Sequence, residues 1–457
     1  MALWNKADLE NALKVTVHGD INASGVEIDS RRIKNGDIFI AIKGENTDGH
    51  KHLKQAFENG AVTAIVSDKP DEDLSFPCVM VPDTFAALTK LGEYARNRLT
   101  GKVIGITGSI GKTSVKEICA LAFSALGKTY CTKGNFNNHF GLPLTLANMP
   151  PDTGYAVIEM GMNHAGEIAY LTAIAKPHIA IITNVEAVHL EYFSSVDAIA
   201  DAKAEIFGSG SLAQWSVATA ILNRDNKYYE YLAAKASESG VGRVASFGKS
   251  QGADARLLRA ENHNLAVSIL GDEFSFSFVS IYQHQAVNTL PALAAVYALG
   301  LDYKLAARSL AEFRDAEGRG RLHNIKLAGK SITMIDDSYN ASPASMRAAL
   351  EALANYDCKG GKIAVLGDML ELGDKSPEFH RELASTIDKA GLSVLVTCGN
   401  LMQNLHDSTS KNIRRIHAGS IDEIPKVLAS LVNDDDVILI KGSHGSGMYK
   451  VVYLLKN

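Results

Sequence analysis

The chain has 457 residues, of which 46% are hydrophobic and 21% are charged, and its formal net charge at pH 7 is -5. This length predicts about three domains, and the composition is typical of a globular protein with ample apolar core. The acidic balance argues against a nucleic-acid-binding surface, because such surfaces are basic. Five cysteines at irregular spacings predict reduced thiols in a cytoplasmic protein, with no zinc site. We also expect no signal peptide and no transmembrane segment, because the apolar runs are too short.

The first block, residues 1–98, predicts a small α/β domain. Segments 37–42 and 61–66 are rich in apolar and β-branched residues, which predicts strands. Between them, residues 52–59 predict a helix that ends at Gly60. The order strand, helix, strand is typical of a parallel sheet.

The central block, residues 99–314, opens with the most informative segment of the chain. Residues 102–114, KVIGITGSIGKTS, predict an apolar strand, a glycine-rich turn and the start of a helix. Such a loop directs backbone N–H groups and the positive end of a helix dipole at one point, which suits the phosphates of a nucleoside triphosphate. Lys112 has the reach for the β- and γ-phosphates, and the Thr113 hydroxyl is a ligand for Mg²⁺. The spacing departs from the usual motif, because Ile106 stands where a glycine is common.

Two further strands of the central block end in polar residues. Segments 155–159 and 178–183 are apolar, and the helical stretches between strands predict parallel pairing through right-handed crossovers. Open parallel sheets bind ligands beyond the carboxyl ends of their strands, which would bring Glu159, His189 and Thr113 together around one Mg²⁺. On spacing alone, Glu159 could instead cap the following turn, and His189 could be a loop residue with no ligand role.

The last block, residues 315–457, repeats the alternation of strands and helices and predicts a second open α/β domain. Ser342-Pro343 and Ser376-Pro377 predict helix starts, each with an N-cap serine and a proline at the first helical position. The predicted strands are 331–335, 362–366, 392–397 and 437–440. The predicted fold class is therefore α/β with three domains. These are a small N-terminal α/β domain (1–98), a central P-loop-type parallel-sheet domain (99–314) and a C-terminal Rossmann-like domain (315–457).

Several motifs follow one another in the order found in a known family. They resemble segments of the Mur ligases, the ATP-dependent amide-forming enzymes of peptidoglycan precursor synthesis, and the resemblance covers essentially the whole chain. The matching segments are 107–114, 134–145, 158–164, 184–191 and 202–207. Segments 336–343, 366–373 and 441–443 are most similar to the members that add D-alanyl-D-alanine. The Asp-Asn-Pro-Arg motif of the members that add the third amino acid is not found.

This resemblance implies an activity, two substrates and a cofactor. ATP would phosphorylate the terminal carboxylate of a UDP-N-acetylmuramoyl-tripeptide, and the free amine of D-alanyl-D-alanine would then attack the acyl phosphate. Phosphoryl transfer needs mainly positioning and charge neutralisation, which suits Mg²⁺. A cytoplasmic monomer without a nucleic-acid partner is expected. The sequence leaves open whether the third residue of the tripeptide is diaminopimelate or lysine.

The resemblance also implies roles for individual residues. Either Arg319 or Arg321 would reach the γ-phosphate, and the spacing does not decide between them. Phosphate and nucleotide contacts are implied for Gly108, Ser109, Ile110, Gly111, Lys112, Thr113, Ser114, Asn288, Asp337 and Asn340. The first domain would bind the UDP part of the substrate, and substrate contacts are implied for Ser30, Arg31, Asn137, Asn138 and His164.

The resemblance implies a specific chemical modification for Lys203. On sequence alone it is a surface lysine, because lysines on helices usually are. The resemblance aligns it with a lysine that reacts with CO₂ to form a carbamate, which would join Thr113, Glu159 and His189 as a ligand of Mg²⁺. Carbamylation requires the neutral amine, so Lys203 must lie where its pKa is lowered or where the metal traps the product.

Two positions depart from the family pattern. Gln285 stands where asparagine is common, and His444 stands where arginine is common. A neutral histidine cannot make the bidentate carboxylate contact of arginine, so a dipeptide contact at His444 stays open. Structural alternatives also remain, namely a polar turn at residues 29–31 and a solvated linker for the two arginines.

Other classes of function stay open. One is a different carboxylate–amine ligase, either a sibling Mur enzyme or a protein similar to folylpolyglutamate synthase. Another is a P-loop ATPase that acts as a switch or motor and forms no bond. Finally, residues 102–114 could be an ordinary strand–turn–helix corner.

Overall fold

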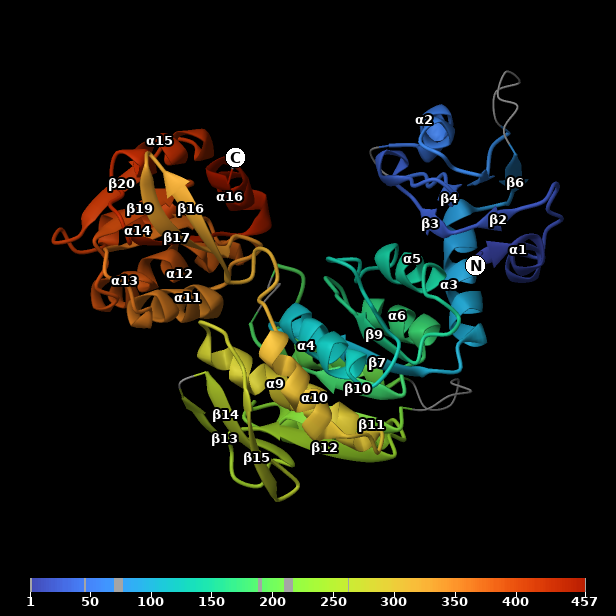
Figure 1. Ribbon diagram of the computed structural model, residues 1–457, viewed down its shortest axis with the longest axis horizontal. Coiled ribbons are helices and arrows are strands. Elements are labelled where there is room, and N and C mark those ends of the chain that lie inside the picture. Colours follow the sequence, from blue (N-terminus) through green and yellow to red (C-terminus); the bar gives the residue numbers. More distant parts are fainter. Residues whose placement is uncertain are drawn as a thin grey trace. The chain divides into compact units, whose positions relative to one another are not determined.

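The computed structural model describes residues 2–44, 47–69, 77–187, 191–208, 217–261 and 263–456. This part of the chain forms two compact units, which we describe separately (Figure 1). The first consists of Met1–Val185, Ile199–Ala255 and Pro291–Ala306, and the second of Glu186–Ala198, Arg256–Leu290 and Ala307–Asn457. None of the helices in the described residues combines the length and apolarity that crossing a membrane requires.

A small parallel sheet in the order β3-β4-β5-β6 opens the first unit. Strand β4 is buried along its whole length, as is usual for parallel strands covered on both faces. Asp83 starts α3, because its carboxylate accepts a hydrogen bond from the Ala86 N–H at 2.8 Å. The elements are β1 (Trp4–Asn5), α1 (Lys6–Leu13), β2 (Asn22–Ala23), β3 (Gly25–Glu27), β4 (Asp37–Ile40), α2 (Leu53–Glu58), β5 (Thr63–Val66), β6 (Cys78–Met80) and α3 (Thr84–Arg98).

The rest of the first unit is built on parallel strands in the order β12-β11-β10-β7-β9-β8. Strand β7 lies between β10 and β9, and helix α4, which follows β7, packs on β7, β8 and β9 (Figure 1). The carboxyl ends of β7, β9 and β10 therefore meet at one edge of the sheet. The strands are β7 (Lys102–Thr107), β8 (Thr129–Cys131), β9 (Tyr155–Glu159), β10 (Ile179–Ile182), β11 (Thr219–Asn223) and β12 (Arg243–Gly248). The helices are α4 (Lys112–Ser124), α5 (Gly141–Ala147), α6 (Glu167–Ala175), the 3-10 turn η3 (Glu205–Phe207) and α8 (Tyr229–Glu238). Three further helices, α7 (Val196–Ala204), α9 (Gln283–Ala298) and α10 (Tyr303–Ser309), are each divided between the two units.

The second unit contains a sheet in the order β16-β17-β21-β18-β19-β20, in which only the β16–β17 pair is antiparallel among the described strands. Successive residues of a strand point to opposite faces, so Ile335 packs in one core and Met334 in another. The strands are β16 (Arg321–Leu327), β17 (Lys330–Asp337), β18 (Lys362–Gly367), β19 (Val394–Cys398), β20 (Arg414–Ala418) and β21 (Val437–Lys441). The helices are α11 (Pro343–Asn355), α12 (Ser376–Glu382), α13 (Ala384–Lys389), α14 (Met402–Ser408), α15 (Ile424–Ala429) and α16 (Met448–Lys456).

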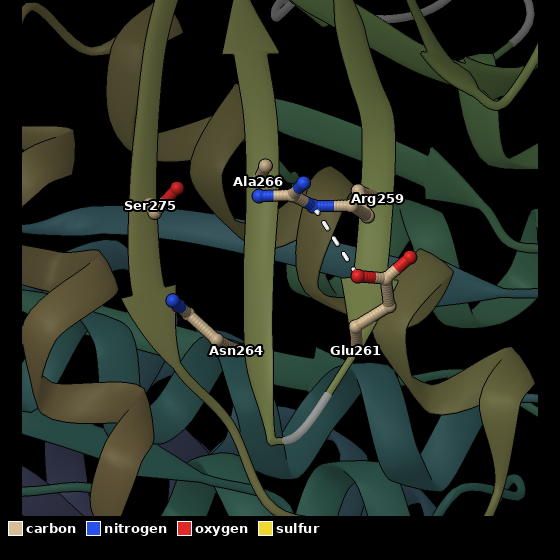
Figure 2. Close-up of a pocket in the computed structure, with 5 residues that line it drawn as sticks. All are labelled: Arg259, Glu261, Asn264, Ala266 and Ser275. Carbon is tan, nitrogen blue, oxygen red and sulfur yellow. Dashed lines mark ion pairs between the residues drawn. The ribbon is translucent and has the colours of Figure 1, made fainter.

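A ribbon of three adjacent strands, β13 (Ala255–Glu261), β14 (Asn264–Ile269) and β15 (Asp272–Ser277), was not predicted from the sequence. Its outer face carries a shallow pocket of about 270 Å³ (Figure 2). In this pocket Arg259 pairs with Glu261 on the same strand, at 3.7 Å between Nε and Oε2. The other lining residues are Asn264, Ala266 and Ser275, and none of the predicted site residues is among them.

The two predicted helix starts of the last block have different outcomes. Ser342 is the N-cap of α11, where its side chain and that of Ser345 form a reciprocal capping box, and Pro343 opens the helix as predicted. The prediction that Ser376 is an N-cap is wrong. A 3-10 turn over Gly373–Lys375 runs directly into α12, so Ser376 is already helical and makes no cap.

Candidate active site

The predicted phosphate loop joins β7 to α4, and two of its glycines are required by the backbone. Gly108 has a φ of 149°, and a Cβ atom there would lie 1.9 Å from the Thr183 hydroxyl oxygen. Gly111 is the left-handed N-cap of α4, with a φ of 85°, a conformation that costs glycine little. The chain thus turns sharply into a helix whose first residues are Lys112 and Thr113. A helix N-terminus suits an anion, because its backbone N–H groups and the positive end of its dipole point at one place.

The loop is held in place by the neighbouring strand β10. The Thr183 hydroxyl donates to the Ile110 carbonyl at 2.6 Å, and the Ser109 N–H donates to the Asn184 carbonyl at 2.8 Å. The Ser109 N–H is therefore engaged by the protein itself. Sequence reasoning missed this support, although Thr183 and Asn184 directly follow an apolar strand.

Lys112 lies over the loop that precedes it. Its ammonium donates to the Gly108 carbonyl at 2.7 Å and to the Ser109 carbonyl at 3.4 Å. Its charge is therefore held at the end of β7, where the predicted phosphates would lie.

Glu159 ends β9 and is 2% exposed. Its Oε1 atom accepts a hydrogen bond from the Asn137 amide at 2.8 Å and lies 3.4 Å from the Thr113 hydroxyl. Its Oε2 atom is buried without a hydrogen-bond partner among the described residues. A buried carboxylate oxygen without a partner is costly, so this pair of oxygens fits a cation next to Thr113.

A fully buried lysine that the sequence analysis did not single out supports Glu159. The Lys116 ammonium contacts the Thr132 carbonyl at 2.9 Å and the Glu117 carboxylate at 2.7 Å. The Thr132 hydroxyl in turn accepts the Glu159 N–H at 3.0 Å. Helix α4 is thus tied to the end of β9, and the only signal in the sequence was the position of Lys116 one turn after Lys112.

Lys203 lies near the end of α7 and is 2% exposed, which excludes the alternative of a surface lysine. Burial lowers the pKa of its amine well below the ordinary value, and the charge of Lys112 lowers it further. Burial therefore disfavours the charged form of this amine compared with that of an exposed lysine. His189, the other predicted ligand from this part of the chain, lies outside the described residues.

The second unit gathers a different set of predicted residues. The Lys441 ammonium, at the end of β21, donates to the Asp337 carboxylate at 2.7 Å and to the Asn340 carbonyl at 2.9 Å. The Tyr282 hydroxyl donates to the same Asp337 oxygen at 2.9 Å, and burial raises the pKa of this phenol. Sequence reasoning named Asp337 and Asn340 as site residues and Lys441 only as part of a family motif. It missed Tyr282 and the contact between Lys441 and Asp337, because these residues are distant in the chain.

The two candidate arginines have different surroundings. The Arg319 guanidinium lies 4.1 Å from the centre of the Tyr339 ring, a cation–π contact. Arg321 is half-exposed and pairs with Glu317 at 3.4 Å. His444 stacks on the Tyr449 ring, with 4.8 Å between the ring centres, and the centre of the tilted Tyr339 ring lies 5.8 Å from that of His444.

Asn288 belongs to a hydrogen-bonded chain at the start of α9. Its amide donates to the Gln285 side-chain oxygen at 2.9 Å, and the Gln285 amide donates to the Asp315 carboxylate at 3.0 Å. Burial raises the pKa of Asp315 to about 7, and the charge of Asp337 contributes.

The predicted substrate contacts of the first unit have mixed surroundings. Ser30 is buried, and its hydroxyl donates to the Gln55 side-chain oxygen at 2.7 Å. Arg31 is exposed and pairs with Asp29 at 2.7 Å, and this hydrogen bond lowers the pKa of the Asp29 carboxyl. Asn138 accepts the Gly141 N–H at 2.8 Å at the start of α5. His164 is exposed and lies 3.5 Å from Glu167.

The structure thus brings the predicted residues together in separate groups. In the first unit, Lys112, Thr113, Asn137 and Glu159 surround the phosphate loop, and Lys203 is buried within reach of the Lys112 charge. In the second unit, Asp337 and Asn340 share Lys441.

Comparison with known proteins gives a consistent result. Three family models match successive parts of the chain: "Mur ligase family, catalytic domain" over residues 22–96, "Mur ligase middle domain" over 106–296, and "Mur ligase, glutamate ligase domain" over 320–444. The chain is 35% identical to the UDP-N-acetylmuramoyl-tripeptide–D-alanyl-D-alanine ligase of Rickettsia prowazekii, over 98% of this chain and 99% of the relative.

Solved structures agree with this result. The crystal structure of MurF from Acinetobacter baumannii superimposes with a TM-score of 0.83 at 29% identity, covering 99% of this chain and 98% of that chain. MurF from Thermotoga maritima in complex with ADP gives a TM-score of 0.75 at 28% identity, covering 95% and 97%.

Proposed function

The chain belongs to the Mur ligase family, and from this we propose that it joins D-alanyl-D-alanine to UDP-N-acetylmuramoyl-tripeptide at the expense of ATP. The relative from Rickettsia prowazekii bears the name of this reaction and aligns over nearly the full length of both chains. The structural observation that carries the proposal is the buried Glu159 carboxylate, which has one unpartnered oxygen and lies beside Thr113 at the phosphate loop.

The reaction has two steps with balanced bonds. The terminal carboxylate of the tripeptide attacks the γ-phosphorus of ATP, the bond to the β-phosphate oxygen breaks, and ADP leaves. The neutral amine of D-alanyl-D-alanine then attacks the acyl carbon, loses a proton and expels phosphate, which leaves an amide. A free carboxylate is a poor electrophile, so the first step supplies the leaving group that the second step needs.

The residues of the phosphate loop serve the first step. The N-terminus of α4 and the Lys112 ammonium hold the β- and γ-phosphates and offset the charge that develops on them. Lys112 already lies against the Gly108 carbonyl, so little side-chain reorganisation is needed to reach phosphates bound in this loop.

The donor set fits Mg²⁺. A hard cation prefers oxygen ligands, and the Thr113 hydroxyl and the Glu159 carboxylate supply them at the mouth of the loop. When bound, Mg²⁺ would neutralise phosphate charge during transfer. The Asn137 amide donates to the Oε1 atom of Glu159, and the Oε2 atom of Glu159 remains for the cation. His189 remains part of the proposed set.

Lys203 completes the proposed ligands as a carbamate. Its neutral amine would attack CO₂ to form an N–C bond and release a proton, giving an anionic oxygen pair. The buried position and the lowered pKa of Lys203 favour the neutral amine. An ammonium in this place would repel both Lys112 and the cation, whereas a carbamate attracts them.

The remaining predicted residues belong to the proposal as substrate contacts. Arg319 is preferred over Arg321 for the γ-phosphate, because Arg321 is paired with Glu317 whereas Arg319 rests on the Tyr339 ring. Nucleotide contacts are proposed for Asn288, Asp337 and Asn340, and substrate contacts for Ser30, Arg31, Asn137, Asn138 and His164. Three domains are proposed: residues 1–98 bind the UDP part of the substrate, residues 99–314 bind ATP, and residues 315–457 form a C-terminal Rossmann-like domain. The protein is proposed to act as a cytoplasmic monomer.

Product analysis tests the proposed function. The purified protein is incubated with ATP, Mg²⁺ and a UDP-N-acetylmuramoyl-tripeptide, together with D-alanyl-D-alanine, diaminopimelate, lysine or glutamate in separate reactions. Among the four amines, we expect only D-alanyl-D-alanine to give a product. The mass of the UDP-N-acetylmuramoyl-tripeptide should then increase by that of one dipeptide minus one water. A product with one of the other amines would assign a sibling ligase instead, and turnover of ATP without any new amide would support the switch.

A further inference from the structure

The Glu205 carboxylate joins two elements that are far apart in the chain. One of its oxygens accepts the Gly166 N–H at 2.7 Å, and the other accepts the Ala169 N–H at 3.0 Å. Both donors belong to the N-terminus of α6, while Glu205 opens the 3-10 turn that follows α7. Glu205 therefore connects the end of α7 to the start of α6 by two hydrogen bonds from one charged group.

Helix α6 depends on this external carboxylate for its cap. Its N-cap residue is Gly166, which has no side chain to accept the free N–H groups of the first turn. A carboxylate is well suited to this position, because its charge also complements the positive end of the helix dipole. The nearer acid, Glu167, is engaged elsewhere and accepts the N–H groups of Asn163 and His164 at 2.7 and 3.2 Å.

The two connected elements carry two proposed ligands of the same cation. Lys203 lies two positions before Glu205, near the end of α7. Glu159 ends β9, and the chain from Glu159 leads through the Glu167-bound loop directly into α6. The hydrogen bonds of Glu205 thus fix the Lys203 segment against the segment that continues from Glu159.

We propose that Glu205 is a positioning residue that holds the Lys203 side chain at the Glu159 end of β9. This inference rests on the proposed function, in which Lys203 and Glu159 bind one Mg²⁺. Residues that orient metal ligands typically change metal affinity about 10–100-fold when they are removed. A residue that only caps a helix changes stability and leaves metal affinity unaltered.

The experiment compares Glu205→Ala and Glu205→Gln with a matched control. Asp302 caps α10 in a similar way, since it accepts the N–H groups of Lys304 and Leu305 at 3.0 and 2.9 Å, and it has no role in the proposed site. Asp302→Ala therefore reports the cost of losing a helix cap alone. For each protein we would measure Tm, the Mg²⁺ concentration for half-maximal rate, kcat at saturating Mg²⁺, and the ¹³C NMR signal of the carbamate formed from ¹³CO₂.

We expect Glu205→Ala to raise the half-maximal Mg²⁺ concentration at least about tenfold and to weaken the carbamate signal. Its kcat at saturating Mg²⁺ should fall less. Glu205→Gln keeps one oxygen acceptor, so it should show intermediate values, and it provides the same readouts if Glu205→Ala fails to fold. Asp302→Ala should lower Tm and leave both Mg²⁺ dependence and carbamate signal as in the wild type.

Two outcomes would overturn separate parts of the account. If the carbamate signal and the Mg²⁺ dependence are unchanged in both Glu205 variants, Glu205 only caps helix α6 and does not position Lys203. A wild-type protein without any carbamate signal would instead overturn the carbamate of the proposed function, on which this inference depends.

Discussion

At the scale of single residues, Lys112 gives the most direct test of the phosphate loop. Its ammonium is held over the loop by the Gly108 carbonyl, where it would meet the γ-phosphate in the transition state. We expect Lys112→Ala to lower kcat by about 10²–10³, the usual cost of one lost electrostatic contact to a transition state, with Tm unchanged. Lys128→Ala is the matched control, because Lys128 is an exposed lysine paired with Asp152. Activity of Lys112→Ala within a few-fold of the wild type would mean that this loop binds its nucleotide differently.

Lys203 allows a rescue experiment. Lys203→Ala removes the proposed carbamate and leaves a small space in a buried site, so we expect almost no activity. Added acetate or formate should restore part of the rate, because a short carboxylate supplies the lost anionic oxygens. Lys235→Ala, a change at an exposed lysine next to Asp201, should keep full activity and show no response to acetate. Full activity of Lys203→Ala without additives would rule out the carbamate.

The sequence identified these residues to different degrees. Lys112 and Thr113 follow from local spacing alone, because a strand, a glycine turn and a helix start fix where their side chains must lie. Lys203 does not, since nothing local distinguishes a buried lysine from a surface lysine on a helix, and only the resemblance to a family singled it out. Lys116 was missed for the same reason, as its partner Thr132 comes from another element.

At the scale of elements, Asp315 connects the start of α9 to the segment before β16. Its carboxylate accepts hydrogen bonds from the Ser280 hydroxyl at 3.1 Å and the Gln285 amide at 3.0 Å, and burial raises its pKa from 3.8 to about 7. The folded protein therefore holds this proton at pH values where the unfolded chain has lost it. Stability from this group is present at low pH and is lost as the pH rises from about 4 to about 7.

This linkage predicts a pH-dependent difference in melting temperature. Asp315→Asn cannot ionise, so its Tm should fall less than that of the wild type between pH 5 and pH 8. Each 1 kcal/mol of difference corresponds to about 2–4 °C for a protein unit of 150–250 residues. Thermal unfolding of both proteins at the two pH values measures the effect. Parallel Tm changes in the two proteins would show that Asp315 ionises normally in the fold.

Elements were predicted well where their signals are local and missed where they are not. The N-cap at Ser342, with Pro343 opening the helix, and the strand before the phosphate loop are confirmed. The start of α12 was placed one residue late, because a preceding 3-10 turn merges with the helix without a cap. The half-buried ribbon β13–β15 was missed, since alternating strands give a weaker signal than continuous apolar runs.

At the scale of the whole molecule, the α/β fold class with parallel sheets and the Mur ligase family are confirmed. The predicted domain boundaries and the roles of the site residues stay predictions. Sequence motifs could indicate that Asp337 and Lys441 matter, but their contact depends on two parallel strands meeting in register. Such contacts follow from the fold and cannot be read from local spacing.

The central claim is that ATP hydrolysis is coupled to the joining of two substrates. It is tested most directly by phosphate release from ATP, measured with UDP-N-acetylmuramoyl-tripeptide alone, with D-alanyl-D-alanine alone and with both. The acyl phosphate forms only on a bound carboxylate and turns over only when an amine accepts it, so steady release should require both substrates. Equal rates of phosphate release with either substrate omitted would contradict the ligase and favour a nucleotide switch.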